Sequence, residues 1–407
     1  MTGKIAMDNP IVEIDGDEMA RVMWAWVKER LILPYVDLKT EYYDLHIKRR
    51  DETHDHVTIQ AAESIKRWKV GVKCATITPN AERVKEYNLK KEWKSPNATI
   101  RSALDGTIFR APIILSNVQP AVRFWKKPIV VARHAFGDIY DGVGLRFEGP
   151  AECEVMIRQH DGREVKAKFP SFKCSGVLQG IYNLDSSIES FARASFMYAL
   201  ENRLDLWFAA KDTISKVYDG RFKEIFSRIY REEFNEKFTE AGLNYHYYLI
   251  DDAVARAVRS EGGFVWACKN FDGDVLSDFV AAAYVGSLAL MTSALFSPEG
   301  HFLSEAAHGT VQKHYYKHLK GEKTSTNPTA IIFAWTAALR RRGELDGNSA
   351  LVEFACKLEN AVRLTIERDR VMTADVANVS EPPVHAVVCT EDFIEAVKRN
   401  LNRLIDP

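Results

Sequence analysis

The 407-residue sequence lacks the features that mark several large classes of protein. Its six cysteines form no C-x-x-C pair and show none of the close spacings that build zinc sites or disulfide scaffolds, which favours a reducing compartment. It also lacks an excess of either charge. Lys and Arg number 55 against 56 Asp and Glu, so the chain has no positive field for a phosphate backbone, and we expect no nucleic-acid partner.

Targeting and membrane signals are also missing. Residues 1–10 contain neither the apolar core of a secretory signal nor the amphipathic pattern of a transit peptide, so we expect a cytoplasmic protein. The uncharged run 279–296 reaches the length of about 18 residues at which a membrane helix can form. It is rich in small and hydroxylated residues and follows Asp274 and Asp278. This composition predicts a helix buried between other helices, and no membrane span.

The usual nucleotide-binding glycine motifs are absent. The nearest match to G-x-G-x-x-G, at Gly142-Val143-Gly144, has no third glycine at the required spacing and no acidic residue about 20 positions on. There is no Walker-type phosphate loop either. A dinucleotide must therefore be held in another way.

Strand-like and helix-like segments alternate along the chain. Residues 11–14 predict a strand, and the apolar spacing over 19–27 predicts an amphipathic helix. Residues 59–65 read as a helix that runs into a strand at 70–72, and 129–131 read as a buried strand. This alternation predicts an α/β fold with a mostly parallel sheet, and the length predicts two or three domains.

Local signals mark further elements. The stretch 154–169 has strand composition with a hairpin signal at Asp161-Gly162, which predicts a β-rich insert. Ser186 and Glu189 form a capping-box pattern, and Asn327-Pro328 supplies an N-cap and a first-turn proline for another helix. The last helix shows one apolar face, made by Phe393, Val397, Leu401 and Leu404.

Acidic residues with helical spacing offer a metal site. Asp274 and Asp278 are four residues apart, so on a helix their carboxylates project from one face and can share Mg²⁺ or Mn²⁺. Asp251-Asp252 offers a third ligand. A solvated helix face with no metal is the competing interpretation.

Basic residues offer sites for an anionic ligand. Arg101, Arg110 and Arg133 lie outside charge runs, and three guanidinium groups suit a ligand with several carboxylates, although each alone also fits a surface ion pair. Lys73, Thr76 and Thr78 flank a strand end, where open α/β sheets bind ligands, or they form an ordinary loop exit. The stretch from His308 to His314 offers backbone N–H groups and two cations, which fits either a phosphate cradle or a basic surface loop.

Together these stretches resemble the homodimeric NADP-dependent isocitrate dehydrogenases, from about residue 11 to about residue 377. Several long blocks occur in the family's order. The blocks are GDEM at 16–19, VKCATITP at 72–79, WKSPN at 93–97, RHAFGD at 133–138, WACKNFDGDV at 266–275, EAAHGTV at 305–311 and TSTNP at 324–328. The resemblance implies oxidative decarboxylation of isocitrate to 2-oxoglutarate and CO₂ with reduction of NADP, dependent on Mg²⁺ or Mn²⁺.

The resemblance also implies roles for individual residues. The substrate's carboxylates would be bound by Thr78, Ser95, Asn97, Arg101, Arg110 and Arg133. Asp274, Asp278 and a partner subunit's Asp251 would hold the metal, and Tyr140 with a partner's Lys211 would transfer protons. NADP would be held by Thr76, Thr78, Arg83, Asn97, Arg259, Gly309, Thr310, Val311, Lys313, His314 and Asn327, with Arg259 reaching across from the second subunit. The active site would therefore need a homodimer.

The implied fold is isocitrate/isopropylmalate dehydrogenase-like. It has a large Rossmann-like domain without the G-x-G-x-x-G motif (1–104 and 286–407), a small α/β domain (105–137 and 186–285) and a β-rich clasp (138–185). Three departures stand out: Lys313 where the family has Arg, Ile139 beside Tyr140, and Asp212 beside Lys211. Because of these departures, three other functions stay possible: a related enzyme that prefers NAD, a related dehydrogenase that acts on another 2-hydroxy acid, and a family member without catalytic activity. Ser95 with Asn97 favours isocitrate.

Overall fold

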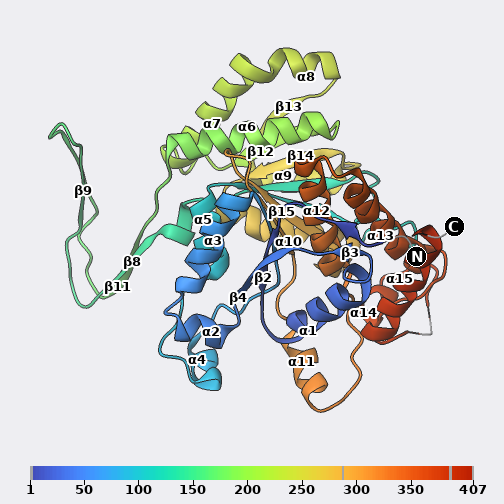
Figure 1. The fold of residues 1–407 in the computed structure, drawn as a ribbon. Coiled ribbons are helices and arrows are strands. Elements are labelled where there is room, and N and C mark those ends of the chain that lie inside the picture. Colours follow the sequence, from blue (N-terminus) through green and yellow to red (C-terminus); the bar gives the residue numbers. More distant parts are fainter. Residues whose placement is uncertain (1–2, 287, 385–386, 406–407) are drawn as a thin grey trace.

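Ten strands form one sheet through the centre of the protein, as the computed structural model shows for residues 3–286, 288–384 and 387–405 (Figure 1). The strands are β2 (Ile11–Asp15), β4 (Thr40–Asp44), β5 (Val70–Lys73), β6 (Thr107–Pro112), β7 (Ile129–His134), β12 (Asp205–Ala210), β13 (Tyr245–Leu249), β14 (Phe264–Cys268), β15 (Met291–Phe296) and β16 (Phe302–Ala306). Their order is β13-β12-β14-β7-β6-β15-β16-β5-β2-β4. Pairing is parallel towards both edges and antiparallel from β7 through β6 and β15 to β16, which confirms the predicted mostly parallel α/β sheet.

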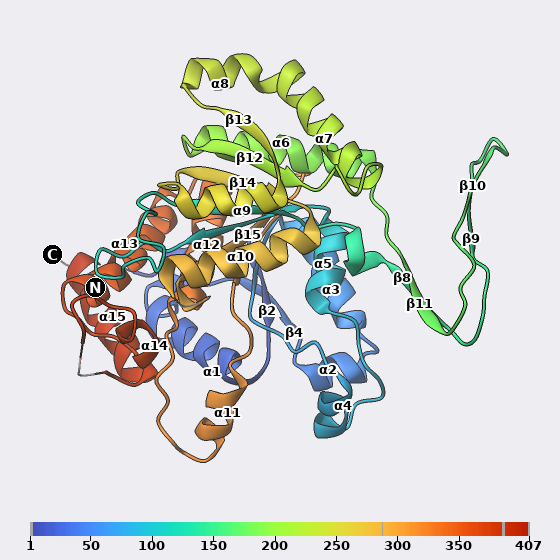
Figure 2. The same cartoon turned by 180° about the vertical axis from the view of Figure 1, so that it is seen from behind.

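Helices cover both faces of this sheet (Figures 1 and 2). The helices are α1 (Glu18–Val27), α2 (Ile47–Glu52), α3 (His56–Trp68), α4 (Ala81–Tyr87), α5 (Pro96–Leu104), α6 (Asp185–Glu201), α7 (Tyr218–Ile229), α8 (Asn235–Ala241), α9 (Ile250–Arg259), α10 (Asn270–Val285), α11 (Gln312–Leu319), α12 (Thr329–Asp346), α13 (Ser349–Glu367), α14 (Ala374–Ala377) and α15 (Thr390–Ile405). Shorter 3₁₀ or π segments are η1 (Lys28–Ile32), η2 (Asp138–Asp141), η3 (Tyr230–Phe234) and η4 (Leu288–Leu290).

Alternate side chains of each strand enter different cores. On β2, Ile11 packs into the core shared with α12, α13 and α15, whereas Val12 packs under α3 and α5. On β14, Trp266 shares a core with α10, whereas Val265 joins the aromatic core beneath α6 and α7. This is the two-residue period of a strand buried on both faces. This period determines which residues of the strands point toward α10.

A two-part arm projects from the body of the protein (Figures 1 and 2). In it β8 (Val143–Phe147) pairs antiparallel with β11 (Gly176–Gly180), and β9 (Glu154–Arg158) pairs antiparallel with β10 (Glu164–Lys168). The hairpin predicted at Asp161-Gly162 is confirmed. The boundaries proposed for the three domains stay predictions, since the central sheet runs through both predicted α/β domains.

The prediction for residues 279–296 was wrong over its second half. Helix α10 ends at Val285, and residues 291–296 form β15 in the middle of the sheet. The stretch is apolar because both faces of β15 are covered, a pattern that a buried helix and a buried strand share. No helix in the described part of the chain is long and apolar enough to cross a membrane.

Two helix starts differ from their sequence signals. Helix α6 begins at Asp185, so Ser186 lies inside its first turn and forms no cap, while Glu189 pairs with Arg193 and Arg228. One ion pair within α6 and one to α7 have therefore replaced the capping box. Helix α12 begins at Thr329, one residue later than predicted, and Asn327 accepts a hydrogen bond from the Thr329 backbone N–H at 2.8 Å.

Candidate active site

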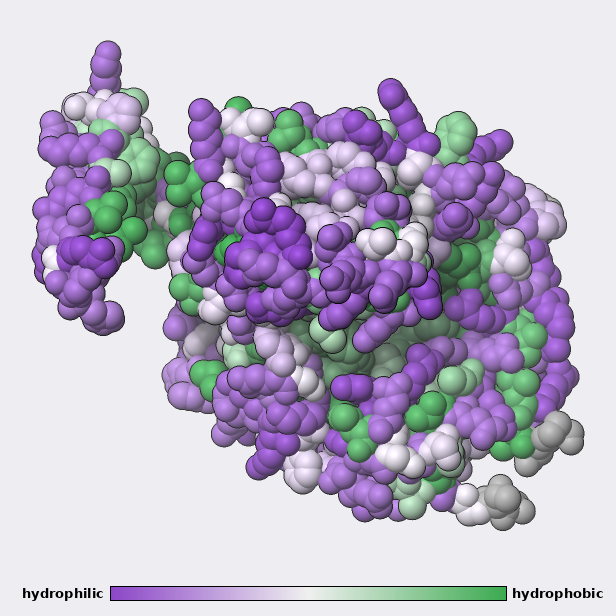
Figure 3. Space-filling model, turned by 90° about the horizontal axis from the view of Figure 1, so that it is seen from above, coloured by the Kyte–Doolittle hydropathy of each residue, from purple (hydrophilic) through white to green (hydrophobic). Residues whose placement is uncertain are grey.

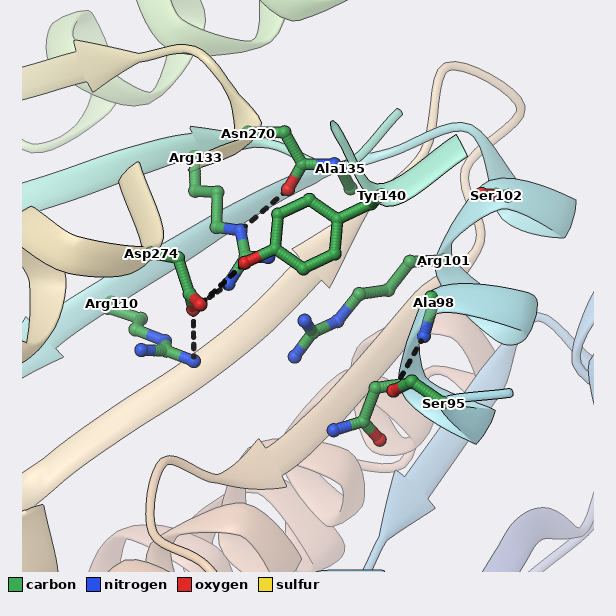
Figure 4. Close-up of a pocket in the computed structure, with 11 residues that line it drawn as sticks. Ser95, Ala98, Arg101, Ser102, Arg110, Arg133, Ala135, Tyr140, Asn270 and Asp274 are labelled. Carbon is green, nitrogen blue, oxygen red and sulfur yellow. Dashed lines mark hydrogen bonds and ion pairs between the residues drawn. The ribbon is translucent and has the colours of Figure 1, made fainter. Parts of the chain in front are cut away.

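A polar cavity of about 170 Å³ lies where β6, β7, η2, α5 and α10 meet (Figure 4). Its lining consists of Ser95, Asn97, Ala98, Arg101, Ser102, Arg110, Arg133, Ala135, Tyr140, Asn270 and Asp274. Seven of these residues were predicted as substrate, metal or catalytic residues from the sequence. They come from segments up to 179 positions apart (95 to 274), so the fold has brought distant motifs to one place.

The local backbone explains this convergence. Arg110 on β6 and Arg133 on β7 both lie on the sheet face beneath α10, because their strand neighbours Phe109 and Ala132 enter the opposite core. Gly273 lets α10 approach β7 closely. A Cβ atom at this position would lie 2.8 Å from the Arg133 Cβ. Asp274 follows immediately, at the start of the second turn of α10.

Asp274 is the centre of the hydrogen-bond network. Its Oδ1 is in contact with an Arg133 Nη1, its Oδ2 accepts from the Tyr140 hydroxyl at 2.6 Å, and an Arg110 Nη2 lies 3.9 Å from Oδ1 (Figure 4). Burial opposes ionisation of this carboxyl, but the attraction of Arg133 and the Tyr140 hydrogen bond outweigh it and hold the pKa of Asp274 below its usual range. Asp274 is therefore an anion at neutral pH.

Tyr140 is a phenol poised to stay protonated. Burial, together with its hydrogen bond to Asp274, raises the pKa of Tyr140 to about 12, even though Arg133 acts in the opposite direction. The Arg133 guanidinium carbon lies 4.8 Å from the centre of the Tyr140 ring. The arrangement can present a proton donor to a ligand in the cavity.

Arg133 is fixed from two sides. It is 2% exposed, and its Nε donates to Asn270 Oδ1 at 2.8 Å. Burial, with repulsion from Arg101, lowers the pKa of Arg133 to about 10, so it keeps its charge at neutral pH. A buried cation aimed into a polar cavity is suited to bind a carboxylate.

The other two arginines are paired with acids. Arg110 donates to Ser277 Oγ at 2.7 Å and to Asp278 Oδ1 at 2.9 Å, and Arg101 contacts Glu305. Two buried polar atoms facing this region, Arg110 Nε and Asn97 Oδ1, have no hydrogen-bond partner in the described part of the chain. A polar ligand would satisfy such atoms.

The predicted metal ligands are only partly assembled within one chain. Asp274 and Asp278 lie on the same side of α10, with side chains that are 39% and 59% exposed. Their anionic oxygens suit a hard divalent cation, and the low pKa of Asp274 adds to the fit. Across the described residues no group of three or more His, Cys, Asp or Glu is assembled that could hold a metal ion, so within one chain Asp274 and Asp278 stand without a third carboxylate.

Lys211 and Asp251 lie outside the cavity lining but close to each other. Lys211 Nζ donates to Asp251 Oδ1 at 2.5 Å, and Asp251 is 66% exposed. The neighbour of Lys211, Asp212, accepts hydrogen bonds from Tyr247 and from Lys223, the latter at 2.8 Å. The carboxylate of Asp212, which departs from the family pattern, is thus hydrogen-bonded to Tyr247 and Lys223 and not to Lys211.

The residues predicted to hold NADP are spread over several segments. Thr76 accepts from the buried Lys73 at 3.0 Å, whereas Thr78 and Gly309 are exposed. Arg83 and Thr310 both contact the carboxylate of Glu18. Val311 has a left-handed φ of 58°, Arg259 ends α9, and Asn327 Nδ2 donates to Thr373 at 2.9 Å, which indicates a structural function as well.

Lys313 and His314 fit an anionic group. Lys313 is exposed and forms no ion pair with any described residue, and His314 Nδ1 is buried with no hydrogen-bond partner there. Both lie in the first turn of α11, where backbone N–H groups also point outward. These donors are suited to a phosphate group.

Three arginines beneath α10 give this α/β protein a cavity that is suited to a small molecule with several carboxylates. The chain matches the family model described as isocitrate/isopropylmalate dehydrogenase over residues 6–397. It is 50% identical over 399 residues to the NADP isocitrate dehydrogenase of Sphingobium yanoikuyae, covering 98% of each chain. It is 48% identical over 407 residues to the mitochondrial NADP isocitrate dehydrogenase of Saccharomyces cerevisiae, covering 99% of this chain and 95% of the relative. The chain belongs to the isocitrate/isopropylmalate dehydrogenase family, which confirms the expected fold class.

The structure adds residues that sequence reasoning did not single out. Asn270 orients Arg133, Glu305 pairs with Arg101, and Glu18 joins Arg83 to Thr310. All three lie in the sequence blocks that carried the family resemblance. Their function was missed because hydrogen bonding between distant segments leaves no spacing signal in the sequence.

Proposed function

We propose that this chain is an NADP-dependent isocitrate dehydrogenase, which converts isocitrate to 2-oxoglutarate and CO₂ and reduces NADP. The observation that carries this function is the cavity in which Arg101, Arg110 and Arg133 converge beside Asp274. Near 50% identity to NADP isocitrate dehydrogenases over almost the whole chain supports the same activity.

The three arginines, with Ser95 and Asn97, would bind the substrate's carboxylates. Arg110 and Arg133 are now paired with Asp278 and Asp274, and the substrate's anionic groups would exchange for these partners. Charge-assisted hydrogen bonds from guanidinium groups would fix the orientation of a tricarboxylate as well as its affinity. Thr78, exposed in the loop before α4, would complete the set.

The proton transfers would be divided between two side chains. Lys211 of the partner subunit would accept the proton of the substrate hydroxyl while hydride passes to NADP. After loss of CO₂, Tyr140 would donate a proton to the carbon that carried the lost carboxylate, because its phenol is protonated at neutral pH. Asp274, Asp278 and the partner subunit's Asp251 would hold Mg²⁺ or Mn²⁺, which stabilises negative charge on the substrate oxygen.

The exposed apolar residues of the arm favour a second copy of the chain as the binding partner. Its strands carry apolar side chains that are largely exposed, among them Val143 at 65%, Leu145 at 58% and Val177 at 81%. Figure 3 shows apolar surface gathered on this arm. An exposed β-arm of this kind is suited to pair with an identical arm across a two-fold axis. Dimerisation would also supply Lys211 and Asp251 to the cavity of the other subunit.

NADP would lie along the segment from Thr310 to His314, between Arg83 and Asn327. Lys313 and His314 are proposed to contact the 2′-phosphate, and Arg259 would approach from the other subunit. The ammonium group of Lys313 is a point charge, whereas the guanidinium group of an arginine binds a phosphate through two hydrogen bonds. We therefore expect the preference for NADP over NAD to be smaller than it would be with arginine at this position. The cytoplasmic location likewise stays a prediction.

One assay separates this function from its alternatives. Purified protein is mixed with isocitrate, NADP and Mn²⁺, and NADPH is followed by absorbance, with 2-oxoglutarate identified as the product. Repeats use a chelator, NAD in place of NADP, and isopropylmalate in place of isocitrate. We expect metal-dependent turnover that is fastest with isocitrate and NADP. Turnover with another 2-hydroxy acid alone, or no turnover at all, would favour a divergent or non-catalytic relative.

A further inference from the structure

Glu18 is a buried acid at the start of α1, three residues after the end of β2. Its side chain is 1% exposed. Helices α1, α4 and α11 lie at the same end of the protein, the lower end in Figures 1 and 2. Glu18 is therefore placed between the helix that carries Arg83 and the loop that leads into α11.

The Glu18 carboxylate receives donors from both of these segments. Arg83 approaches with both terminal nitrogens, Nη1 at 2.9 Å from Oε1 and Nη2 at 3.2 Å from Oε2. The Tyr87 hydroxyl donates to Oε1 at 3.2 Å, and the Thr310 hydroxyl donates to Oε2. A buried carboxylate with this many donors is held in one position, and it holds its donors in turn.

The backbone at Glu18 is strained, and its neighbours keep it so. Its φ is 55°, a left-handed value that residues other than glycine rarely adopt. On one side Asp17 accepts from the backbone N–H groups of Ile47 and Ile77, and on the other side the Ala20 N–H donates to Thr310 O at 3.2 Å. Strain that the surroundings enforce is typical of functional positions.

We propose that Glu18 is a positioning residue for NADP, which holds Arg83 and Thr310 at the spacing that the cofactor requires. The inference rests on the proposed function, which places both residues in the NADP site. If Glu18 acted on NADP only through its negative charge, the opposite effect on NADP binding would be expected. An acid beside the phosphates of NADP would repel them, so its removal would tighten binding.

The test measures NADP binding by calorimetric titration of the full-length protein and three variants. Glu18→Gly removes every contact of the carboxylate, and glycine accepts the positive φ, so the backbone conformation at this position is kept. Glu18→Gln removes the charge but keeps an acceptor. The matched control is Glu86→Gln, because Glu86 also pairs with Arg83, at 2.7 Å, but its other hydrogen-bond partner is Tyr316, where Glu18 has Thr310. Thermal unfolding without ligand and KM for isocitrate are measured alongside.

We expect the Kd for NADP to rise about tenfold or more in Glu18→Gly and by less in Glu18→Gln, as loss of charge-assisted hydrogen bonds requires. The KM for isocitrate and kcat at saturating NADP should change little, Glu18→Gly should unfold at a lower temperature yet stay folded at the temperature of the assay, and Glu86→Gln should resemble the parent. Unchanged or tighter NADP binding in Glu18→Gly would overturn the inference while the parent still oxidises isocitrate. A parent that neither binds NADP nor oxidises isocitrate would instead refute the proposed function, and this inference with it.

Discussion

Replacing Asn270 with alanine tests how the cavity holds its most buried arginine. Asn270 is 4% exposed, and its Oδ1 accepts from Arg133 Nε at 2.8 Å. Loss of a buried hydrogen bond to a charged group costs about 1.5 to 3 kcal/mol. Arg133 would then lose its fixed orientation toward the substrate. We therefore expect kcat/KM for isocitrate to fall about 10- to 100-fold, with NADP affinity unchanged.

The assay is the initial rate of NADPH formation over a range of isocitrate concentrations, at saturating NADP and Mn²⁺. The matched control is Asn202→Ala, which removes an exposed amide that donates to the Tyr198 carbonyl at 2.9 Å, outside the cavity. Thermal unfolding of both variants shows whether the fold is intact. A folded Asn270→Ala protein with kcat/KM within about twofold of the parent would refute the positioning of Arg133 by Asn270.

Three further predictions follow from other parts of the structure. Lys211→Ala and Asp274→Asn should each inactivate the enzyme, yet a co-refolded mixture should regain about a quarter of the parental activity, because each hybrid of the proposed dimer would have one intact site; no recovery would place both residues in one subunit's site. Lys313→Arg should raise the ratio of kcat/KM for NADP over NAD severalfold, and an unchanged ratio would separate Lys313 from the 2′-phosphate. Burial opposes ionisation of Glu305, but the positive charges of Arg101 and Lys73 outweigh burial and lower the pKa of Glu305 from 4.5 to about 2. The ionised carboxylate therefore stabilises the folded state fully above pH 4.5, and this contribution to the free energy of unfolding disappears as the pH falls towards 2. In chemical denaturation at pH 4.5 and below, the parent should therefore lose more unfolding free energy than Glu305→Gln, and equal losses would contradict this.

Helices and strands could be predicted from the sequence where the apolar residues kept one regular spacing along the whole segment. Residues 11–14 and the helix after them, the hairpin at Asp161-Gly162 and the apolar face of α15 all form as expected. The stretch 279–296 could not be divided correctly, since a buried helix and a strand covered on both faces have the same composition. The capping box at Ser186 failed because Glu189 found stronger partners in Arg193 and Arg228.

The site was predicted chiefly through family blocks, and only the fold could show how its residues meet. The spacing of Asp274 and Asp278 predicted a shared face of a helix, and α10 provides it. The pairing of Asp274 with Arg133 and Tyr140 joins residues more than 130 positions apart (133 and 140 to 274), which no local pattern records. Asp212 illustrates the same limit, because its partners Lys223 and Tyr247 were invisible in the sequence.

The most direct test of the central claim is the steady-state rate of isocitrate oxidation by Asp274→Asn. Asn keeps the size of the side chain and removes the charge that Arg133, Tyr140 and a divalent cation would share. The matched control is Asp185→Asn, an exposed aspartate paired with Arg221. We expect kcat/KM for isocitrate with NADP and Mn²⁺ to fall at least about a hundredfold in Asp274→Asn and to stay at the parental value in the control. A folded Asp274→Asn protein that turns over isocitrate as fast as the parent would contradict the assignment of this cavity as the active site.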